Sequence, residues 1–306
     1  MKILYINTNR YDYLTSSLTE GLNDAGHEVF CSEKANYGKQ IPLEHLQEYG
    51  ENADLIIIGS DLAKSYLVQN IQNPNKVFVD GSDYQFLNVP SNIRFKAVFK
   101  RELNKLHSQE NIYPLPFASE KRYFPAQYPP KDILVSFLAN VHTNTFRYSI
   151  LERLKRIRRN GIVVGSTGER SYNPAAPAPE FQPTPKYHNL IARSLISVNV
   201  VGAGWDCARY WEILAARSML FTQKLDIQIP FPFQDGVNCV EFETFAEFED
   251  KLEYYMNNPD KAIEIIQKAW VHLCKYHTTK ARAEYFIEKA KISIQKEGYC
   301  KEFLHQ

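Results

Sequence analysis

The chain has 306 residues, of which 44% are hydrophobic and 23% are charged, and its formal net charge is +1. This length and composition predict a globular protein with two domains, each large enough to bury its own core. Because the net charge is close to zero, the composition excludes a bulk electrostatic attraction to nucleic acid or to an anionic membrane. A partner must therefore be recognised by a local site.

The first residues of the chain and its cysteines indicate the cellular compartment to expect. Residues 3–6 form a short apolar run typical of a buried strand rather than of a signal-peptide core, and no apolar run approaches the length of a membrane span. The five cysteines are scattered without a Cys-x-x-Cys pair, so the sequence predicts neither a disulfide framework nor a zinc site. We therefore expect a cytoplasmic protein without a transmembrane segment.

Short apolar runs alternate with segments of helical periodicity in the first half of the chain. The runs expected to form strands are residues 2–6, 27–31, 55–58, 77–80, 95–99 and 112–115. The segments expected to form helices are residues 14–25, 43–49 and 62–71. Strands that are apolar on both faces and lie between helices are typical of parallel sheets, so residues 1–120 are predicted to form a doubly wound α/β domain.

A proline-rich segment separates this region from a second alternation of the same kind. Since Pro125, Pro129 and Pro130 cannot continue a helix or a central strand, residues 121–131 are expected to form an interdomain linker. After it, strands are expected at 133–138, 162–164 and 197–201, and helices at 145–159, 186–195, 245–256, 260–276 and 278–296. Residues 132–277 thus predict a second Rossmann-like domain, which faces the first across a cleft and binds ligands beyond the carboxyl ends of its strands.

Residues 197–221 form the most informative segment, because they are typical of a strand, a glycine turn, a helix and a strand in succession. The turn contains Gly202 and Gly204, which permit a ligand to approach the backbone closely. Asp206 is expected to cap or open the helix that follows. The free N–H groups and the dipole at such a helix end form a binding site for phosphate.

Asp206, Arg209 and Glu212 follow one another at three-residue spacing, which places them on one face of this helix. The Arg209 guanidinium suits a phosphate, and the Glu212 carboxylate could accept hydrogen bonds from ribose hydroxyls. The alternative is a surface row of ion pairs, in which Arg209 partners Asp206 and Glu212 partners Arg209 or Arg217.

Two further positions in the second half are candidates for donor binding. Arg147 opens a helix after the strand at 133–138, where a second phosphate-binding cation is expected, although a surface arginine is the alternative. His142 lies in the preceding polar loop and could bind phosphate or sugar hydroxyls, or it could simply be exposed. The turn at 165–168 resembles a phosphate loop in composition but lacks the Gly-Lys-Ser/Thr ending, which argues against an ATPase.

Carboxylates that follow the first-half strands are candidates for a base that deprotonates an acceptor hydroxyl. These are Asp12, Asp61, Asp80 and Asp83. Asp83 is favoured because it shares a glycine turn with Asp80, where two like charges could raise one pKa. The alternative is an ordinary Asx turn, which Asp-Gly-Ser-Asp also forms readily.

A run of five basic residues falls on the expected helix at 145–159, at positions Arg153, Lys155, Arg156, Arg158 and Arg159. This run suggests binding of nucleic acid or anionic lipid. Leu151, Leu154 and Ile157 form the apolar stripe of the same helix, so the cations occupy its solvent face. The neutral total charge favours the simpler interpretation of a solvated helix face.

Several motifs together resemble a known family. They are the pattern G-x-G-x-D-x-x-R-x-W-E-I-L-A-A-R-S at 202–218, Pro-Phe-Gln-Asp-Gly at 232–236, the acidic stretch at 245–255 and His-Thr-Thr-Lys-Ala-Arg at 277–282. They are similar to the C-terminal half of CgeB-like glycosyltransferases, bacterial relatives of the group 1 glycosyltransferases with the GT-B fold. Weaker similarity extends to residues 79–83, 99–102 and 113–117 in the first half.

The resemblance implies a metal-independent enzyme that moves a hexosyl or related sugar from a nucleoside-diphosphate sugar to a hydroxyl acceptor, a glycan or a small molecule. It implies that Glu212 binds the donor ribose, and that residues 278–306 form a final helix that often returns to the N-terminal domain. The donor is a substrate, so no cofactor is expected. Arg209 and the adjacent helix end would stabilise the leaving diphosphate, and Asp83 or Asp12 would act as base if the reaction inverts the stereochemistry.

Two rival functions remain open at this point. A nucleotide-sugar epimerase has the same fold and needs the same donor site, but it turns over the donor without an acceptor. A catalytically silent protein would bind the nucleotide sugar without hydrolysing or transferring it. A DNA acceptor is a narrower variant of the main hypothesis, although the charge disfavours nucleic acid as a partner.

Overall fold

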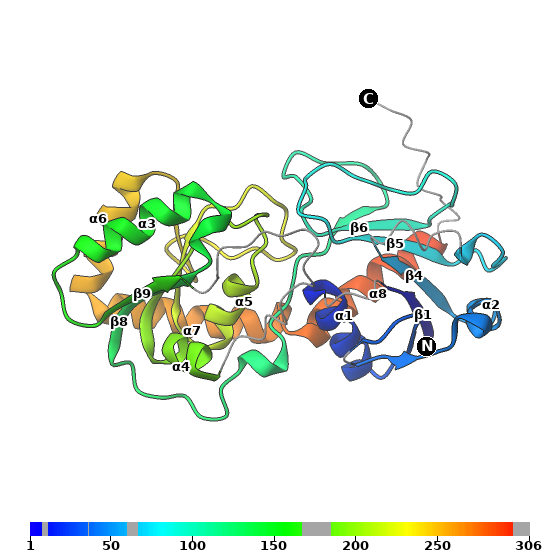
Figure 1. The fold of residues 1–306 in the computed structure, drawn as a ribbon, viewed down its shortest axis with the longest axis horizontal. Coiled ribbons are helices and arrows are strands. Elements are labelled where there is room, and N and C mark those ends of the chain that lie inside the picture. Colours follow the sequence, from blue (N-terminus) through cyan, green and yellow to red (C-terminus); the bar gives the residue numbers. More distant parts are fainter. Residues whose placement is uncertain (8–11, 36, 60–66, 167–184, 296–306) are drawn as a thin grey trace. The chain divides into compact units, whose positions relative to one another are not determined.

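The computed structural model describes residues 1–7, 12–35, 37–59, 67–166 and 185–295. The chain divides into two compact units (Figure 1). The first unit comprises Met1–Ala118, Ile227–Pro230 and Thr278–Gln306, and the second comprises Ser119–Asp226 and Phe231–His277. The structure thus assigns residues 121–131 to the second unit, where Tyr123 is buried. Within the described ranges, no helix combines the length and the apolar character needed to cross a bilayer.

The first unit contains a seven-stranded parallel sheet in the order β3-β2-β1-β4-β5-β6-β7. Its strands are β1 (Lys2–Ile6), β2 (Glu28–Cys31), β3 (Lys39–Gln40), β4 (Leu55–Gly59), β5 (Lys76–Asp80), β6 (Ala97–Lys100) and β7 (Ile112–Pro114). Every residue of the central strand β4 is buried, as expected for a parallel strand covered on both faces.

The helices of the first unit come from both ends of the chain. They are α1 (Tyr13–Asp24), α2 (Leu46–Glu51), which follows the short 3-10 turn η1 (Leu43–His45), and α8 (Thr279–Gln295). The helices α1 and α8 pack so closely that a Cβ atom on Gly21 would lie 2.0 Å from the carbonyl oxygen of Thr279. The Thr279 hydroxyl donates to Glu20 Oε1 at 2.8 Å. The last helix is therefore an integral part of the first unit.

The second unit contains a five-stranded parallel sheet in the order β12-β11-β10-β8-β9. Its strands are β8 (Ile133–Ala139), β9 (Ile162–Ser166), β10 (Ser194–Asn199), β11 (Met219–Gln223) and β12 (Val240–Phe242). The strand β8 lies between β9 and β10. The chain therefore passes from β8 to β9 on one side of it, and then crosses to β10 on the other side. The carboxyl ends of β8 and β10 therefore form a topological switch point, where α/β sheets bind their ligands.

Helices cover both faces of this second sheet (Figure 1). They are α3 (Thr145–Arg156), α4 (Pro185–Arg193), α5 (Ala208–Ala215), α6 (Phe245–Asn257) and α7 (Pro259–Tyr276), with the short 3-10 turns η3 (Lys121–Tyr123) and η4 (Val141–Thr143). The helices α3 and α6 lie on one face, and α4 and α5 lie on the other. The predicted architecture of two doubly wound α/β domains is therefore confirmed.

Some element boundaries differ from those expected. The basic helix ends at Arg156 instead of Arg159, because Ile157 is extended and Gly161 then adopts a φ of +83°. Residues 194–195, expected at the end of a helix, begin β10, and residues 165–166 continue β9 instead of forming a loop. Of the helix expected at 62–71, residues 67–68 form only a short 3-10 turn, and residues 62–66 lie outside the described ranges.

Candidate functional site

Two arginines bind the carbonyl groups at the switch point of the second sheet. Arg209, in α5, donates from Nε to the carbonyl oxygen of Leu138 in β8 at 2.7 Å. Arg147, in α3, donates from Nε and Nη2 to the carbonyl oxygen of Val200 at 3.1 and 2.8 Å. Its Nη1 donates to Asn140 O at 3.1 Å and to the Thr143 hydroxyl at 2.9 Å. Both cations therefore lie where the topology predicts a ligand.

Arg147 is not a surface residue, since only 5% of it is exposed. Its Nη2 also donates to Cys207 Sγ at 3.2 Å, so all five N–H groups of the guanidinium have a partner. Burial, and secondarily the charge of Arg209, lowers the pKa of Arg147 to about 10. A phosphate could bind this side chain only by displacing one of these partners. Its role as a phosphate ligand therefore stays a prediction.

The two glycines of the turn, Gly202 and Gly204, have roles in the packing and hydrogen bonding of the protein itself. A Cβ atom on Gly202 would lie 2.8 Å from Nη2 of Arg147, so a larger residue here would have to displace this buried guanidinium from its hydrogen bonds. The Gly202 N–H donates to the carbonyl oxygen of Gly204 at 3.0 Å, which makes the turn tight. His142 lies in η4, and its side chain is outside the described part of the structure.

Asp206 does not cap helix α5, which corrects the sequence prediction. The helix begins at Ala208, and its N-cap is Cys207, whose side chain makes no capping hydrogen bond. Asp206 is buried, and its Oδ1 accepts from Nε1 of the fully buried Trp211 at 2.8 Å. The reason is that a buried indole N–H needs an acceptor, and Asp206 supplies it. The N-terminus of α5 therefore has no side-chain cap of its own.

Glu212 is buried and its partner comes from another helix. Only 4% of Glu212 is exposed, and its Oε2 accepts from the hydroxyl of Tyr187, in α4, at 2.7 Å. Its Oε1 lies 3.9 Å from Nε2 of His188. Arg217 instead stacks on the rings of Tyr128 and Trp270, 4.2 and 3.9 Å from their centroids. The described contacts of Glu212 therefore do not form the surface ion pair that was the alternative.

Two buried nitrogen atoms of α4 and α5 have no hydrogen-bond partner among the described residues. They are Nη1 of Arg209 and Nε2 of His188. A buried polar atom without a hydrogen-bond partner costs free energy, so such atoms in a folded protein call for an explanation such as a ligand. Neither Tyr187 nor His188 was predicted from the sequence, because both lie on a short helix that has no recognisable motif.

In the first unit, Asp12 acts as the N-cap of α1. Its Oδ1 accepts from the N–H of Leu14 at 3.2 Å, and its Oδ2 accepts from the N–H of Thr15 at 3.0 Å and the Thr15 hydroxyl at 2.7 Å. This is the usual arrangement at a helix start. Both oxygens are therefore engaged, and Asp61, another candidate base, lies outside the described residues.

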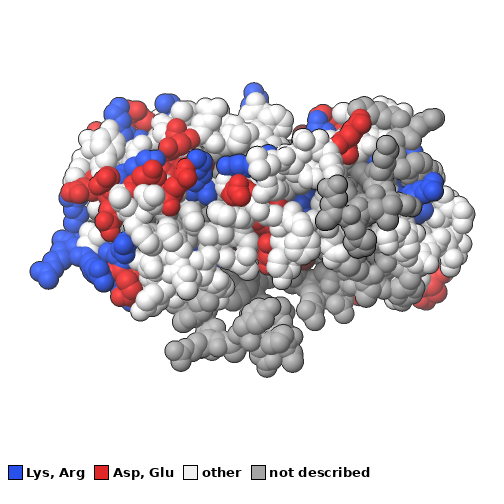
Figure 2. All heavy atoms as spheres, turned by 90° about the horizontal axis from the view of Figure 1, so that it is seen from above, with Lys and Arg blue, Asp and Glu red and all other residues white. Residues whose placement is uncertain are grey.

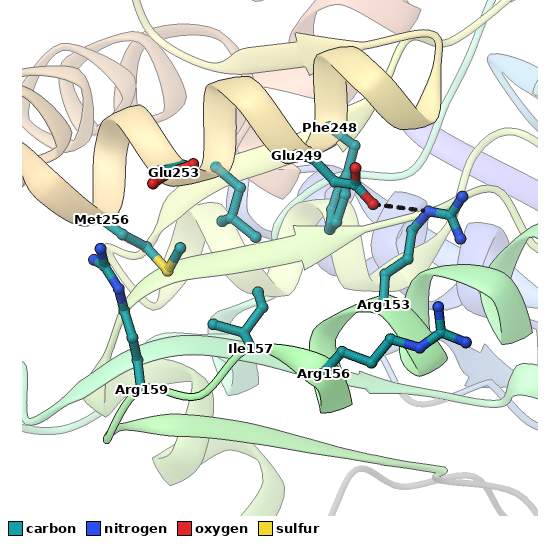
Figure 3. A pocket seen from close by; sticks show the side chains of 9 residues that line it. Arg153, Arg156, Ile157, Arg159, Phe248, Glu249, Glu253 and Met256 are labelled. Carbon is teal, nitrogen blue, oxygen red and sulfur yellow. Dashed lines mark ion pairs between the residues drawn. The ribbon is translucent and has the colours of Figure 1, made fainter.

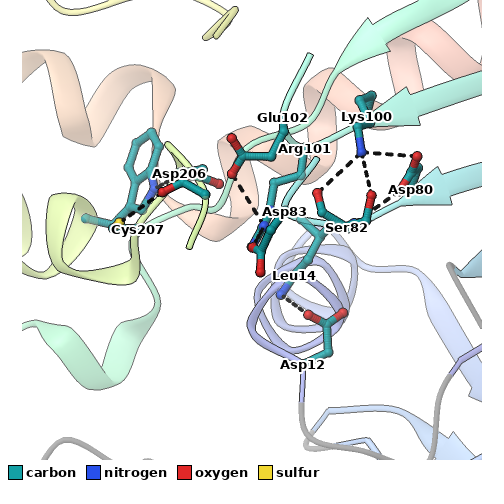
Figure 4. A network of polar contacts seen from close by, with 12 residues as sticks. Asp12, Leu14, Asp80, Ser82, Asp83, Lys100, Arg101, Glu102, Asp206 and Cys207 are labelled. Atoms are coloured by element: carbon teal, nitrogen blue, oxygen red, sulfur yellow. Dashed lines mark hydrogen bonds and ion pairs between the residues drawn. The ribbon is translucent and has the colours of Figure 1, made fainter. Parts of the chain in front are cut away.

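Asp80 and Asp83 each pair with a different cation (Figure 4). Asp80 is buried and its Oδ2 lies 3.1 Å from Nζ of the fully buried Lys100. Asp83 pairs with Arg101, and its side chain is 48% exposed. Burial lowers the pKa of Lys100, which Asp80 partly offsets. Each carboxylate therefore has a cation of its own, and Asp83 is the more accessible of the two.

The basic run on α3 lies beside acidic residues of α6. Arg153 pairs with Glu249, with 3.2 Å between Nε and Oε1, and stacks 3.9 Å from the ring centroid of Phe245. The two helices enclose a shallow pocket of about 400 Å³ whose floor is apolar (Figure 3). Figure 2 shows basic and acidic side chains interspersed on the visible face. This mixture supports the interpretation as a solvated face.

Lys131 links the carboxyl-terminal ends of α4 and α5, the two helices that carry Tyr187, Arg209 and Glu212. Its Nζ donates to the carbonyl oxygens of Ala192 at 2.6 Å and Ala216 at 3.3 Å. Burial, together with the charge of Arg217, lowers the pKa of Lys131 to about 8.

The contribution of Lys131 to the stability of the second unit should therefore depend on pH. Its folded-state pKa is about 8, whereas an unfolded lysine has a pKa of about 10.4. Between these values the unfolded chain binds the proton more strongly, so stability rises with pH, by at most about 1.4 kcal/mol per pH unit. The stability that the lowered pKa of Lys131 contributes is fully present above the unfolded-state pKa, and it is lost as the pH falls through the folded-state pKa of about 8.

The measurement compares denaturant unfolding of the wild type and of Lys131→Met from about pH 7.5 to about pH 9.5. Tryptophan fluorescence monitors the second unit, which contains Lys131, because Trp205, Trp211 and Trp270 all lie in that unit. The wild type should gain stability relative to the variant as the pH rises. Parallel pH profiles would show that the pKa of Lys131 is not lowered.

Comparison with known proteins gives one family match and many similar structures. Residues 147–288 match a family described as glycosyl transferase-like, and this segment contains the glycine turn and α5. A comparison with curated protein sequences gives no significant match.

Three solved structures illustrate the similarity in fold. An α-glucosyltransferase in complex with UDP and a 13-mer DNA has a TM-score of 0.64 at 10% identity, over 95% of this chain and 98% of that chain. A glycosyltransferase from Rickettsia africae has a TM-score of 0.60 at 12% identity, over 97% and 99%. HepE from Anabaena, in complex with UDP-glucose, has a TM-score of 0.56 at 9% identity, over 95% and 100%.

The similarity covers nearly the whole chain and establishes the GT-B fold predicted from the sequence. The glycosyl transferase-like segment lies on the unit that carries the switch point. Residues 147–288 are therefore similar to a glycosyl transferase-like family, and the chain has the fold of GT-B glycosyltransferases.

Proposed function

We propose that the protein transfers a hexosyl or related sugar from a nucleoside-diphosphate sugar to a hydroxyl group, without a bound metal. The observation that carries the proposal is a cluster at the carboxyl ends of β8 and β10. It combines the uncapped N-terminus of α5, the unpartnered Nη1 of Arg209 and the buried carboxylate of Glu212. These groups match a diphosphate and a ribose in chemistry.

Each group has a role in the proposed reaction. When the bond between sugar and phosphate breaks, negative charge accumulates on the leaving diphosphate. Arg209 and the N–H groups at the start of α5 would stabilise that charge, since they are fixed in place before the reaction begins. Glu212 would accept hydrogen bonds from the ribose, and Gly202 and Gly204 would let the diphosphate approach the backbone.

The first unit would hold the acceptor, a glycan or a small molecule. Of the candidate bases for an inverting reaction, Asp83 is favoured over Asp12, because both oxygens of Asp12 already cap α1. A DNA acceptor is disfavoured by the net charge of +1 and by the mixed charges on α3 and α6. Membership of the narrower CgeB-like group stays a prediction from the sequence motifs.

The test is a panel of nucleotide sugars, starting with UDP-glucose, with release of nucleoside diphosphate measured in the presence and absence of hydroxyl acceptors. We expect one donor to be turned over and the rate to rise when the right acceptor is added. Conversion of the donor alone to an epimer would instead indicate an epimerase. Stabilisation by nucleoside diphosphate without any turnover would indicate a silent binding protein, and failure of every nucleotide sugar to bind would refute the proposal.

The same panel can separate a DNA acceptor from the others. Transfer to DNA should be accompanied by DNA binding that weakens steeply as the salt concentration rises. Absence of such binding would remove this variant, while leaving transfer to a glycan or a small molecule intact.

A further inference from the structure

We infer that Tyr187 is a positioning residue of the donor site, whose hydroxyl fixes the Glu212 carboxylate for ribose binding. The inference rests on the proposed function, and it deepens that function by adding a residue from a different helix. Tyr187 belongs to α4, which packs against α5. It does not itself touch the ribose in this proposal, and it acts through Glu212.

The hydroxyl of Tyr187 anchors Glu212 from a neighbouring helix. It donates to Glu212 Oε2 at 2.7 Å. A hydroxyl has one hydrogen, and this hydrogen bond uses it. Arg209, on the same helix as Glu212, is held separately by the carbonyl oxygen of Leu138 at the end of β8, at 2.7 Å. The proposed ribose ligand and the proposed phosphate ligand are therefore each held by a partner outside α5.

Tyr187 is suited to remain a donor under all ordinary conditions. Burial and, secondarily, the adjacent Glu212 charge raise the pKa of Tyr187 well above its usual value. The phenol therefore keeps its proton, and the hydrogen bond to the carboxylate persists across the pH range in which the enzyme would work.

The arrangement also leaves part of Glu212 open. An ionised carboxylate offers about four lone-pair sites. In the described part of the chain, the hydrogen bond from Tyr187 is the one side-chain hydrogen bond to Glu212, because Nε2 of His188 at 3.9 Å is beyond hydrogen-bond distance. One oxygen is thus anchored, while the other can still accept hydrogen bonds from ribose hydroxyls. A carboxylate that is already fixed loses less side-chain conformational entropy on ligand binding than a mobile one.

Removing the hydroxyl should weaken nucleotide binding without changing the chemistry. A hydrogen bond to a charged group contributes more than one between neutral groups, so we expect Tyr187→Phe to raise the Kd of the nucleotide about 10-fold. The effect should be equal for the nucleoside diphosphate and for its free nucleoside, because Glu212 binds the ribose that both share. KM for the donor should rise while kcat changes little.

The experiment is a double-mutant cycle with Tyr187→Phe, Glu212→Ala and both changes together. UDP, GDP, ADP, CDP and dTDP are first titrated into the wild type, and the tightest of them and its free nucleoside are used throughout. Tyr210→Phe is the matched control, since it removes another buried hydroxyl from the helix that carries Glu212. Thermal unfolding followed by tryptophan fluorescence shows whether each variant is folded.

The inference is supported if Tyr187→Phe weakens binding in the wild type but has no further effect in the Glu212→Ala background, while Tyr210→Phe binds normally. Wild-type affinity in Tyr187→Phe, or an equal loss in both backgrounds, would overturn it and leave the proposed function standing. If the wild type binds none of the five nucleoside diphosphates, the proposed function itself fails, and the inference with it. A lower melting temperature with normal affinity would show a purely structural tyrosine.

Discussion

Replacing Arg209 with alanine should lower kcat/KM for sugar transfer by about 100- to 1,000-fold, the loss typical for removal of one preorganised group that stabilises developing negative charge. The reason is its position. The side chain is fixed by the carbonyl oxygen of Leu138 at 2.7 Å, and its buried Nη1 has no other partner in the described structure. In the proposed reaction, a guanidinium held in this way would be oriented before the diphosphate begins to leave.

The control for this change is Arg156→Ala, which removes the same charge from an exposed position of α3 in the same unit. It should leave transfer unchanged. A second readout separates binding from general damage: Arg209→Ala should weaken binding of the nucleoside diphosphate far more than binding of the free nucleoside, which has no phosphate. Equal losses for both ligands, or full activity in Arg209→Ala, would contradict the assignment of Arg209 to the diphosphate.

Replacing Lys100 with methionine should destabilise the first unit by about 3–5 kcal/mol, because the change leaves the charge of Asp80 buried without a counter-ion. Lys100 is fully buried, and its Nζ contacts Asp80 Oδ2 at 3.1 Å and the Ser82 hydroxyl at 2.7 Å. Asp80 Oδ1 also accepts from the Ser82 N–H at 3.0 Å. The Lys100–Asp80 ion pair thus stabilises, through Ser82, the turn that contains Asp83.

The measurement is calorimetric unfolding, because no tryptophan reports on the first unit. Lys100→Met combined with Asp80→Asn should be less destabilised than the sum of the two single changes, since neither charge is then left unpaired. Additive losses would show that the two side chains do not depend on each other. Lys39→Met is a suitable control, as its ion pair with Glu28 is exposed and should contribute little.

Much of the fold could be predicted from local patterns. The buried strands β1, β4 and β5 begin and end within one residue of their apolar runs, because a strand covered on both faces must be apolar throughout. Helix α6 follows Thr244, whose hydroxyl accepts from the N–H of Glu247, and α7 begins at Pro259. Such signals depend on neighbouring residues, so the sequence contains them in full.

The candidate site was predictable only in part. The glycine turn and the α5 helix were found because Gly202, Gly204, Arg209 and Glu212 lie close together in the chain. Tyr187 was missed, since its partner Glu212 is 25 positions away and nothing local marks it. Asp206 was misassigned as a helix cap for the same reason, because the packing of Trp211 decides what its carboxylate binds.

Short-range spacing in the sequence was enough to predict the succession of strands and helices, the glycine turn after β10 and the family resemblance. Only the tertiary structure decided that Arg147 is a fully hydrogen-bonded buried residue, that Asp80 and Asp83 have separate cations, and that Tyr187 holds Glu212. The physical reason is that the partner of a buried polar group is chosen by whatever the fold brings within about 3 Å. That choice depends on the packing of the whole unit.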